Sequence, residues 1–128
     1  MTDRDPVVYL LHMRDYAEEA LGMVEGRSRS DLEDNRMFSR AMERLVGLIG
    51  EAAGNVPIEM RRRFPGIRWR AMIGMRNHLI HGYEYVDYDI VWTTLVESLP
   101  DLLVQLEDAV EELEGRAEPK RGGGDDQA

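Results

Sequence analysis

Apolar side chains recur every three to four positions along five stretches of this chain, the spacing of amphipathic helices. The first stretch follows Asp5 and Pro6, an N-cap residue and a proline suited to the first helical position, and it ends at Gly26. The second begins at Ser30, where Glu33 completes a capping box. Its apolar face is expected at Phe38, Ala41, Met42, Leu45, Leu48, Ile49 and Ala52.

Two further helices are expected in the middle of the chain. Pro57 opens a short one over residues 58–63, and a longer one runs from Ile67 to His81. Gly74 lies inside the longer helix, where glycine costs about 1 kcal/mol relative to alanine. We therefore expect that the chain packs closely against a neighbouring element at this glycine.

A long amphipathic helix is expected in the C-terminal third of the chain. Asp89 is its expected N-cap, and Pro100 should kink or restart it. Its apolar face comprises Val91, Leu95, Leu99, Leu102, Leu106, Ala109 and Leu113. Residues 116–128 contain three consecutive glycines and acidic residues but no apolar residue beyond alanine, so we expect a single domain over residues 1–115 and a disordered tail. The chain has no strand-like alternation and no internal repeat, which predicts an all-α bundle of four to five helices.

The composition excludes several kinds of chemistry. The 128-residue chain has no cysteine, which rules out disulfides, thiolate metal sites, iron–sulfur clusters and cysteine nucleophiles. This absence also suits a reducing compartment. No apolar run approaches the roughly 18 residues of a membrane helix, and the acidic N-terminus does not resemble a signal peptide. We therefore expect a cytoplasmic protein.

The charge is unevenly distributed along the chain. A net charge of −9 argues at first against a nucleic-acid partner, because acidic surfaces repel phosphates. Residues 57–83, however, carry six arginines against the single acidic residue Glu59. Two interpretations of this basic segment stay open from charge alone: a solvated helix face, or a face that meets RNA.

Residues 76–83 hold most of the reactive side chains outside the acidic faces. His78 and His81 are three residues apart, and Glu84 lies nearby, so a partial metal site is one interpretation. A metal site needs three or four ligands, and Glu51 is the only remote candidate, which disfavours this interpretation. No serine lies in a recognisable nucleophile context and no phosphate-binding glycine loop is present, so NTP hydrolysis is not expected.

Cleavage of RNA requires fewer protein groups, because the ribose 2′-hydroxyl is itself the nucleophile. A histidine such as His81 transfers protons near neutral pH, and an arginine such as Arg76 stabilises the negative charge that develops on phosphorus. Residues five apart on a helix point about 140° apart, so the two side chains converge only if the helix ends near His81. Gly82 is consistent with such an end. The alternative is structural: His81 caps the helix and Tyr83 packs beneath it.

The same segment resembles the motif of the HEPN superfamily, which is arginine, four to six residues, histidine, any residue, tyrosine. Arg76, His81 and Tyr83 match it, with the polar Asn77 after the arginine. The surrounding sequence is similar to HepT, the toxin family of HepT–MntA pairs, and this resemblance covers roughly residues 5–113. It is carried by residues 48–52, 64–69, 74–77 and 86–92.

The resemblance implies a HEPN-type helical fold and a metal-independent ribonuclease toxin that needs no cofactor. Arg76 and His81 would be catalytic and leave a 2′,3′-cyclic phosphate, with the motifs of two subunits meeting in the cleft of a homodimer. The implied partner is an MntA-like nucleotidyltransferase antitoxin that transfers AMP from ATP to Tyr83. The basic segment becomes the face that meets RNA, and the residues expected to support RNA binding are Asn77, His78, Arg68 and Arg70.

Other interpretations and details stay open at this point. A catalytically idle helical module that binds a nucleotide or a partner protein is the alternative function, and a purely structural dimer is a third. Transfer RNA is the natural candidate substrate, although nothing in the sequence encodes a base preference. For the dimer, we expect Gly74 and the apolar residues Met72, Met75 and Ile80 to bury a symmetric patch.

Overall fold

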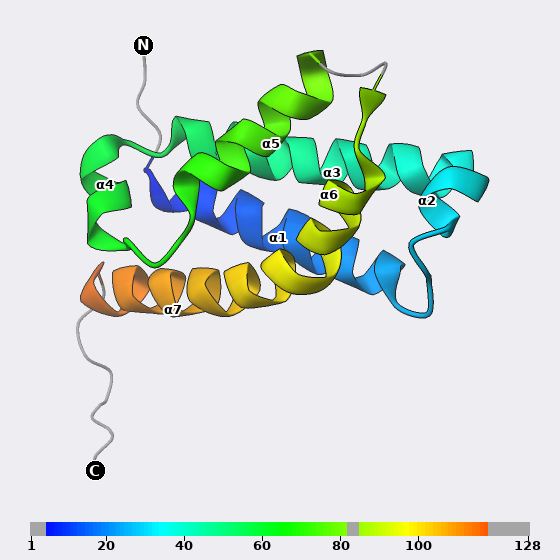
Figure 1. Ribbon diagram of the computed structural model, residues 1–128. Coiled ribbons are helices and arrows are strands. Elements are labelled where there is room, and N and C mark those ends of the chain that lie inside the picture. The colour runs from blue at the N-terminus through cyan, green and yellow to red at the C-terminus, as the bar shows by residue number, and fades with distance from the viewer. Residues whose placement is uncertain (1–4, 82–84, 118–128) are drawn as a thin grey trace.

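The computed structural model describes residues 5–81 and 85–117, and within these ranges the chain is helical and has no strand (Figure 1). The all-α prediction is therefore confirmed. The α-helices are α1 (Val7–Val24), α2 (Asp31–Asp34), α3 (Arg36–Asn55), α4 (Ile58–Arg63), α5 (Trp69–His81), α6 (Tyr88–Thr93) and α7 (Leu99–Ala117). A π-helical segment, Thr94–Ser98, joins α6 to α7.

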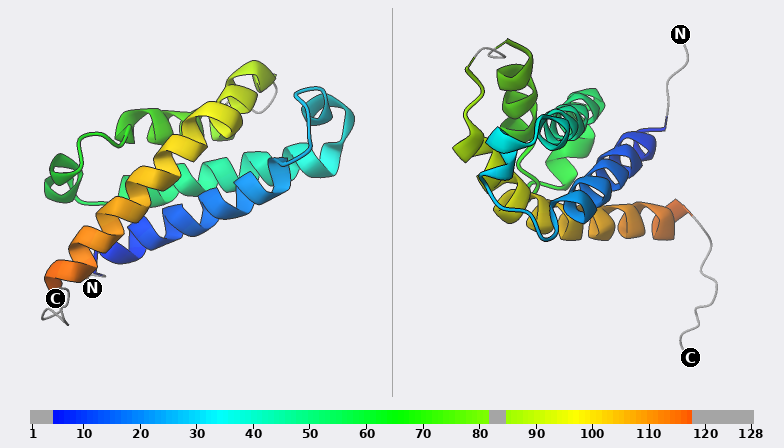
Figure 2. Two further views of the ribbon diagram at one scale, coloured as in Figure 1. Left: turned by 90° about the horizontal axis from the view of Figure 1, so that it is seen from below. Right: turned by 90° about the vertical axis from the view of Figure 1, so that its right-hand side faces the viewer.

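The long helices α1, α3, α5 and α7 form the body of the bundle (Figures 1 and 2). α1 packs against both α3 and α7, and α5 packs on α3. Successive long helices run in opposite directions, and the C-terminal end of α5 rises away from the other helices in Figure 1. The motif segment is therefore carried by the last turns of α5, where Leu79 still packs against the core. None of the described helices is long and apolar enough to cross a membrane.

Apolar side chains on one face of each long helix make the core. The stripe predicted for the second helix is confirmed in α3, where Phe38, Met42, Leu45, Ile49 and Ala52 are buried, with Ala41 and Leu48 at its margins. The predicted C-terminal stripe is also confirmed: its buried members are Val91, Leu95, Leu99, Leu102, Leu106 and Ala109. Burial of such faces is the main favourable contribution to folding.

The second helix predicted from the sequence is divided into two, which corrects the prediction of a capping box at Ser30. The Ser30 side chain makes no cap hydrogen bond, and α2 ends after one turn. Asn35 has extended backbone angles, and its side chain accepts a hydrogen bond from the Phe38 N–H at 3.0 Å. Asn35 caps α3 because its side-chain carbonyl oxygen accepts a hydrogen bond from a backbone N–H that the first turn of α3 leaves without a partner.

Asp89 is not the cap of the C-terminal helix, contrary to prediction. Asp87 takes that role in α6, where its Oδ1 accepts hydrogen bonds from the Asp89 N–H at 2.9 Å and the Ile90 N–H at 3.3 Å. The Asp89 carboxylate instead binds the guanidinium of Arg29, which also contacts Glu33 at 3.1 Å. The pKa of Arg29 is raised mainly by its hydrogen bond to Asp89 and, to a smaller extent, by its hydrogen bond to Glu33. The ion pair ties the α1–α2 connection to α6.

The kink or restart predicted for the last helix at Pro100 takes the form of a π-helical segment, Thr94–Ser98, directly before α7. The backbone stays helical at Leu99, so the helix continues without a restart, and the wider π-helical turn lies where Pro100 cannot donate an intrahelical hydrogen bond. α7 extends to Ala117, slightly past the expected end of the domain. Residues 118–128 lie outside the described residues, and the disordered tail stays a prediction.

The tight glycine of the bundle is Gly50 on α3, and not Gly74 as predicted. A Cβ atom on Gly74 would meet nothing within 4 Å in this chain, whereas one on Gly50 would lie 2.4 Å from the Met72 carbonyl oxygen. The same Cβ would lie 2.5 Å from the Cβ of Arg76. The missing side chain therefore allows α3 and α5 to approach at the turn that carries the motif arginine. Met72 is buried in the core and is not available to the symmetric patch for which it was predicted.

Candidate active site

Arg76 is held against α3 by the close approach of the two helices at Gly50. Its side chain is half-buried, and Nη1 donates a hydrogen bond to Oδ1 of Asn77 at 3.3 Å. The Nε atom is buried and has no hydrogen-bond partner among the described residues. A buried guanidinium donor without a partner is costly unless a ligand supplies an acceptor. Arg76 is therefore positioned as an anion-binding residue.

Arg76 lines a groove of about 260 Å³ between α3 and α5. Arg40, Glu43, Arg44 and Glu51 contribute the charged part of its α3 wall. Arg40 is paired with Glu43 at 3.0 Å, whereas Arg44 has no ion pair with any residue that the structure describes. The groove consequently presents two arginines without carboxylate partners, an arrangement that suits a phosphate group.

His81 is the last residue of α5, and its side chain is exposed. Both Arg76 and His81 are thus within the helix, and the convergence expected within one chain does not occur. The side chains of Arg76 and His81 leave the helix axis about 140° apart, because five residues separate them. Gly82, Tyr83 and Glu84 lie outside the described residues, so the predicted glycine stop and the position of the motif tyrosine stay predictions.

His78 has a partner within the chain. Its Nε2 accepts a hydrogen bond from the backbone N–H of Asp87 at 3.4 Å, and the side chain is half-buried. Asp87 is also the N-cap of α6, so this contact joins the last turn of α5 to the start of α6. The bond is long and therefore weak. The hydrogen bond nonetheless connects the chain segments that precede and follow residues 82–84.

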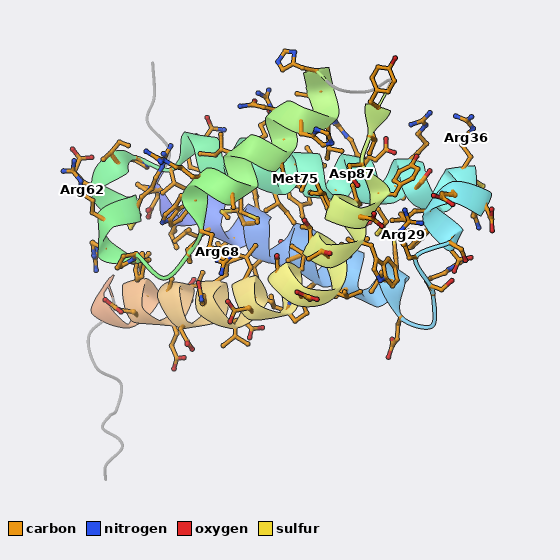
Figure 3. The ribbon with its side chains drawn as sticks, viewed as in Figure 1. Arg29, Arg36, Arg62, Arg68, Met75 and Asp87 are labelled. Carbon is orange, nitrogen blue, oxygen red and sulfur yellow. The ribbon has the colours of Figure 1, made fainter. Side chains whose placement is uncertain are left out.

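The other residues predicted to support RNA binding lie in different places. Arg70 is exposed on the outer side of α5, as is Asn77. Arg68 lies just before α5 and beside α7, as Figure 3 shows, where it lines a separate cavity of about 250 Å³ with Glu97 and Asp101. The structure therefore brings Asn77 together with Arg76 but separates Arg68 from the motif. Two carboxylates beside Arg68 oppose the approach of a phosphate there.

No three histidine, aspartate or glutamate side chains among the described residues are placed to share a metal ion. Of the predicted partial set, His78 is occupied by the α6 backbone, His81 is exposed, and Glu84 lies outside the described residues. Glu51 lies on the α3 wall of the groove. The same groove is lined by Arg76 and Arg44, so a carboxylate and two arginines share it.

Two residues of this site, Arg44 and Gly50, were not predicted as site residues from the sequence. Both lie on α3, more than twenty residues before the motif, and no local pattern connects them to it. The position of Gly50 directly before Glu51, inside a buried helical stripe, was the available signal. Only the pairing of α3 with α5 reveals that a side chain at this position would displace Arg76.

The helical architecture is that of an all-α, HEPN-type protein. The family model described as "Ribonuclease HepT-like" matches residues 13–109. The chain belongs to this HepT-like ribonuclease family. The family assignment supports an endoribonuclease.

Named relatives agree with the family assignment. "Putative RNase TTE0752" of Caldanaerobacter subterraneus subsp. tengcongensis is 33% identical over 108 residues, which cover 84% of this chain and 96% of the relative. "Probable ribonuclease HepT" of Thermococcus cleftensis is 36% identical over 96 residues, covering 70% and 87%. "Putative RNase MJ1216" of Methanocaldococcus jannaschii is 29% identical over 118 residues, covering 92% and 98%. No solved structure matches this chain.

Proposed function

We propose that this protein is a metal-independent endoribonuclease toxin that acts as a homodimer and cleaves RNA with Arg76 and His81. The observation that carries the proposal is the placement of these two side chains. Arg76 enters a groove without a carboxylate partner, and His81 is exposed at the end of the same helix. The cytoplasm is the expected compartment, and transfer RNA is the first substrate to test.

The chemistry needs no metal because the substrate provides the nucleophile. The 2′-hydroxyl oxygen forms a bond to the adjacent phosphorus, the bond from phosphorus to O5′ breaks, and the products end in a 2′,3′-cyclic phosphate and a 5′-hydroxyl. His81 of one subunit accepts the 2′-hydroxyl proton, and the protonated His81 of the second subunit donates a proton to O5′. Arg76 stabilises the extra negative charge on the pentacoordinate phosphorus.

The geometry of α5 supports the proposal of a second copy of the chain. Arg76 and His81 leave the helix about 140° apart, so one chain does not direct both at the same phosphate. Arg70, Gly74, Asn77 and His81 follow each other at three- and four-residue spacing along the exposed side of α5. Gly74 in the middle of this row allows the α5 helix of a second subunit to approach closely, which brings the His81 side chains of the two subunits into one cleft.

Inactivation is assigned to the motif tyrosine. A nucleotidyltransferase antitoxin of the MntA type transfers AMP from ATP: the Tyr83 oxygen bonds to the α-phosphorus, pyrophosphate leaves, and the phenolic proton is released. The adduct adds bulk and about one negative charge two residues from His81, which repels the RNA phosphate. Tyr85 is 81% exposed and Tyr88 donates a hydrogen bond to Glu43 at 3.3 Å, so both serve as control tyrosines.

Cleavage of a transfer-RNA mixture in excess chelator tests the catalytic assignment. We expect that His81→Ala abolishes cleavage and that Arg76→Ala reduces it at least a hundredfold, the usual cost of a lost charge-stabilising group. Arg36→Ala removes the same charge from an exposed position at the start of α3, outside the basic segment, and should leave cleavage unchanged. Loss of cleavage in chelator would restore the metal interpretation. Binding of RNA without any cleavage would support the idle binding module.

Light scattering at micromolar concentration tests the dimer. The wild-type protein should have twice the mass of the chain. Gly74→Arg should be a folded monomer without cleavage activity, because Gly74 is exposed and a Cβ atom there meets nothing within 4 Å in its own chain. Circular dichroism confirms that this variant folds. A monomeric wild type, or a Gly74→Arg variant that still forms active dimers, would refute the shared cleft.

A further inference from the structure

A second cavity lies on the other side of α3 from the motif groove. Tyr9, His12 and Tyr16 line it from one face of α1, at i, i+3 and i+7. The ring centroids of Tyr9 and His12 are 6.4 Å apart with the planes at 86°, and those of His12 and Tyr16 are 6.2 Å apart at 49°. All three side chains are half-buried. The cavity therefore has an aromatic wall whose rings are partly open to solvent.

The opposite wall of this cavity is polar. Glu51 and Asn55, four residues apart at the C-terminal end of α3, line it together with Leu48 and Ala52. The cavity volume is about 320 Å³. Glu51 and Asn55 are both exposed, and neither side chain has a hydrogen-bond partner among the described residues, so both are available to a ligand. Two hydrogen-bonding groups thus face an aromatic surface across a space that no side chain fills.

Glu51 also lines the groove that contains Arg76 and Arg44. The two hollows therefore share a wall at Glu51. An RNA strand that binds in one hollow extends past Glu51 into the other. The motif groove attracts a phosphate through its arginines, whereas the carboxylate at the shared wall repels one. A nucleotide that crosses this border would leave its phosphate beside Arg76 and turn its base toward α1.

We propose that the cavity between α1 and α3 is a subsite for one unpaired guanine of the RNA substrate, an inference that rests on the proposed ribonuclease function. The guanine packs against the Tyr9, His12 and Tyr16 rings, as unpaired bases do on aromatic side chains. The Glu51 carboxylate accepts hydrogen bonds from the N1–H and the 2-amino group. The Asn55 amide, one turn further along α3, donates to O6.

The pairing of donors and acceptors selects guanine among the four bases. Guanine alone presents two adjacent donors, N1–H and N2–H, that match both oxygens of one carboxylate. Adenine and cytosine each present one amino group beside a ring-nitrogen acceptor, which would face the carboxylate lone pairs. Uracil presents a single N–H between two carbonyl oxygens. A carboxylate therefore favours guanine and discriminates against the other three.

Binding of uncleavable oligonucleotides tests the subsite separately from catalysis. The probes are fluorescein-labelled heptamers of 2′-O-methyluridine with guanine, inosine or adenine at the centre, and the methyl group blocks the attacking oxygen. Fluorescence anisotropy with wild-type protein should show about tenfold tighter binding of the guanine probe than of the adenine probe. Inosine keeps N1–H but lacks the 2-amino group, and its affinity should fall between the two.

Three variants locate the preference. Glu51→Gln should bind the guanine and adenine probes equally, whereas Glu59→Gln, with the same change of charge on exposed α4, should keep the tenfold preference. Tyr16→Leu should weaken binding of every probe about tenfold, because aromatic stacking is tolerant of base identity. His81→Ala should keep the preference while cleavage is lost.

The outcomes separate this inference from the proposed function. Cleavage of RNA by a wild type that shows no guanine preference, or whose preference survives Glu51→Gln, would refute the subsite and leave the ribonuclease intact. A guanine preference abolished by Glu51→Gln in a protein that cleaves no RNA would support the subsite and refute the catalytic proposal. Failure of the wild-type protein to bind any probe would overturn the subsite as well.

Discussion

A methyl group added at Gly50 tests whether the close approach of α3 and α5 positions Arg76. The Cβ of Gly50→Ala would lie 2.4 Å from the Met72 carbonyl oxygen and 2.5 Å from the Arg76 Cβ. Ordinary van der Waals contacts begin at 3.4 Å, so the neighbouring atoms must withdraw by 1.0 Å. The nearest of them is a backbone atom, and therefore α5 itself must move.

The magnitude follows from two opposing effects. Overpacking of a tight contact costs about 1–3 kcal/mol, and replacing glycine by alanine inside a helix returns about 1 kcal/mol. The difference is a fall of up to about 2 kcal/mol in the free energy of unfolding of Gly50→Ala, and Tm should fall by about 4 °C per kcal/mol for a domain of this size. Gly47→Ala, one turn earlier on α3, meets nothing within 4 Å and should raise the stability by about 0.5–1 kcal/mol.

Urea denaturation followed by circular dichroism measures both variants against the wild type. RNA cleavage below the unfolding transition adds a second measurement: Gly50→Ala should lose at least tenfold in rate, because a shift of about 1 Å at a positioning contact disturbs the arginine that it holds. If Gly50→Ala were as stable as Gly47→Ala and as active as the wild type, the contact would not position Arg76, and this account of the motif groove would be wrong.

Three further outcomes are expected. Asn35→Ala should cost about 1 kcal/mol of stability in thermal denaturation through loss of the α3 cap, whereas Ser30→Ala should change it by less than about 0.5 kcal/mol; equal losses would contradict the reassigned cap. Tyr83→Phe should keep most of the cleavage activity and resist the antitoxin, and intact-mass spectrometry should show an AMP adduct only on the wild type; an adduct on the phenylalanine variant would mean that another residue is modified. His78→Ala should reduce cleavage far less than His81→Ala. It should also lower the free energy of unfolding by no more than about 1 kcal/mol in the same urea assay, because the hydrogen bond from the Asp87 N–H to His78 is long. Complete loss of cleavage would give His78 a direct part in the reaction.

Much of the secondary structure could be predicted from short-range patterns. The buried face of α3, the short helix after Pro57 and the irregular turn before Pro100 all follow from spacing and from the backbone limits of proline. The end of α5 at His81 was also predicted, from the glycine that follows it. These signals act within one or two turns, and neighbouring residues alone are enough to satisfy them.

Competition between nearby caps was not settled by sequence pattern. Ser30 and Asp89 both had the residue type of an N-cap, yet Asn35 and Asp87 took the role. Asp89 forms an ion pair with Arg29, sixty residues away in sequence, because the folded chain brings α6 beside the α1–α2 connection. A cap residue is chosen by whichever hydrogen bonds the whole fold leaves available, and sequence proximity does not reveal them.

The sequence by itself determined the helical class, the buried stripes and the motif that links Arg76 to His81, because each of these depends on spacing along one helix. Only the tertiary structure decided what surrounds the motif. The register of α3 against α5 placed Gly50 beneath Arg76 and left Gly74 open, and it separated Arg68 from the groove. Such contacts depend on the relative rotation and height of two helices, which no local pattern encodes. The same register also placed Glu51 between the arginines of one hollow and the aromatic rings of the other.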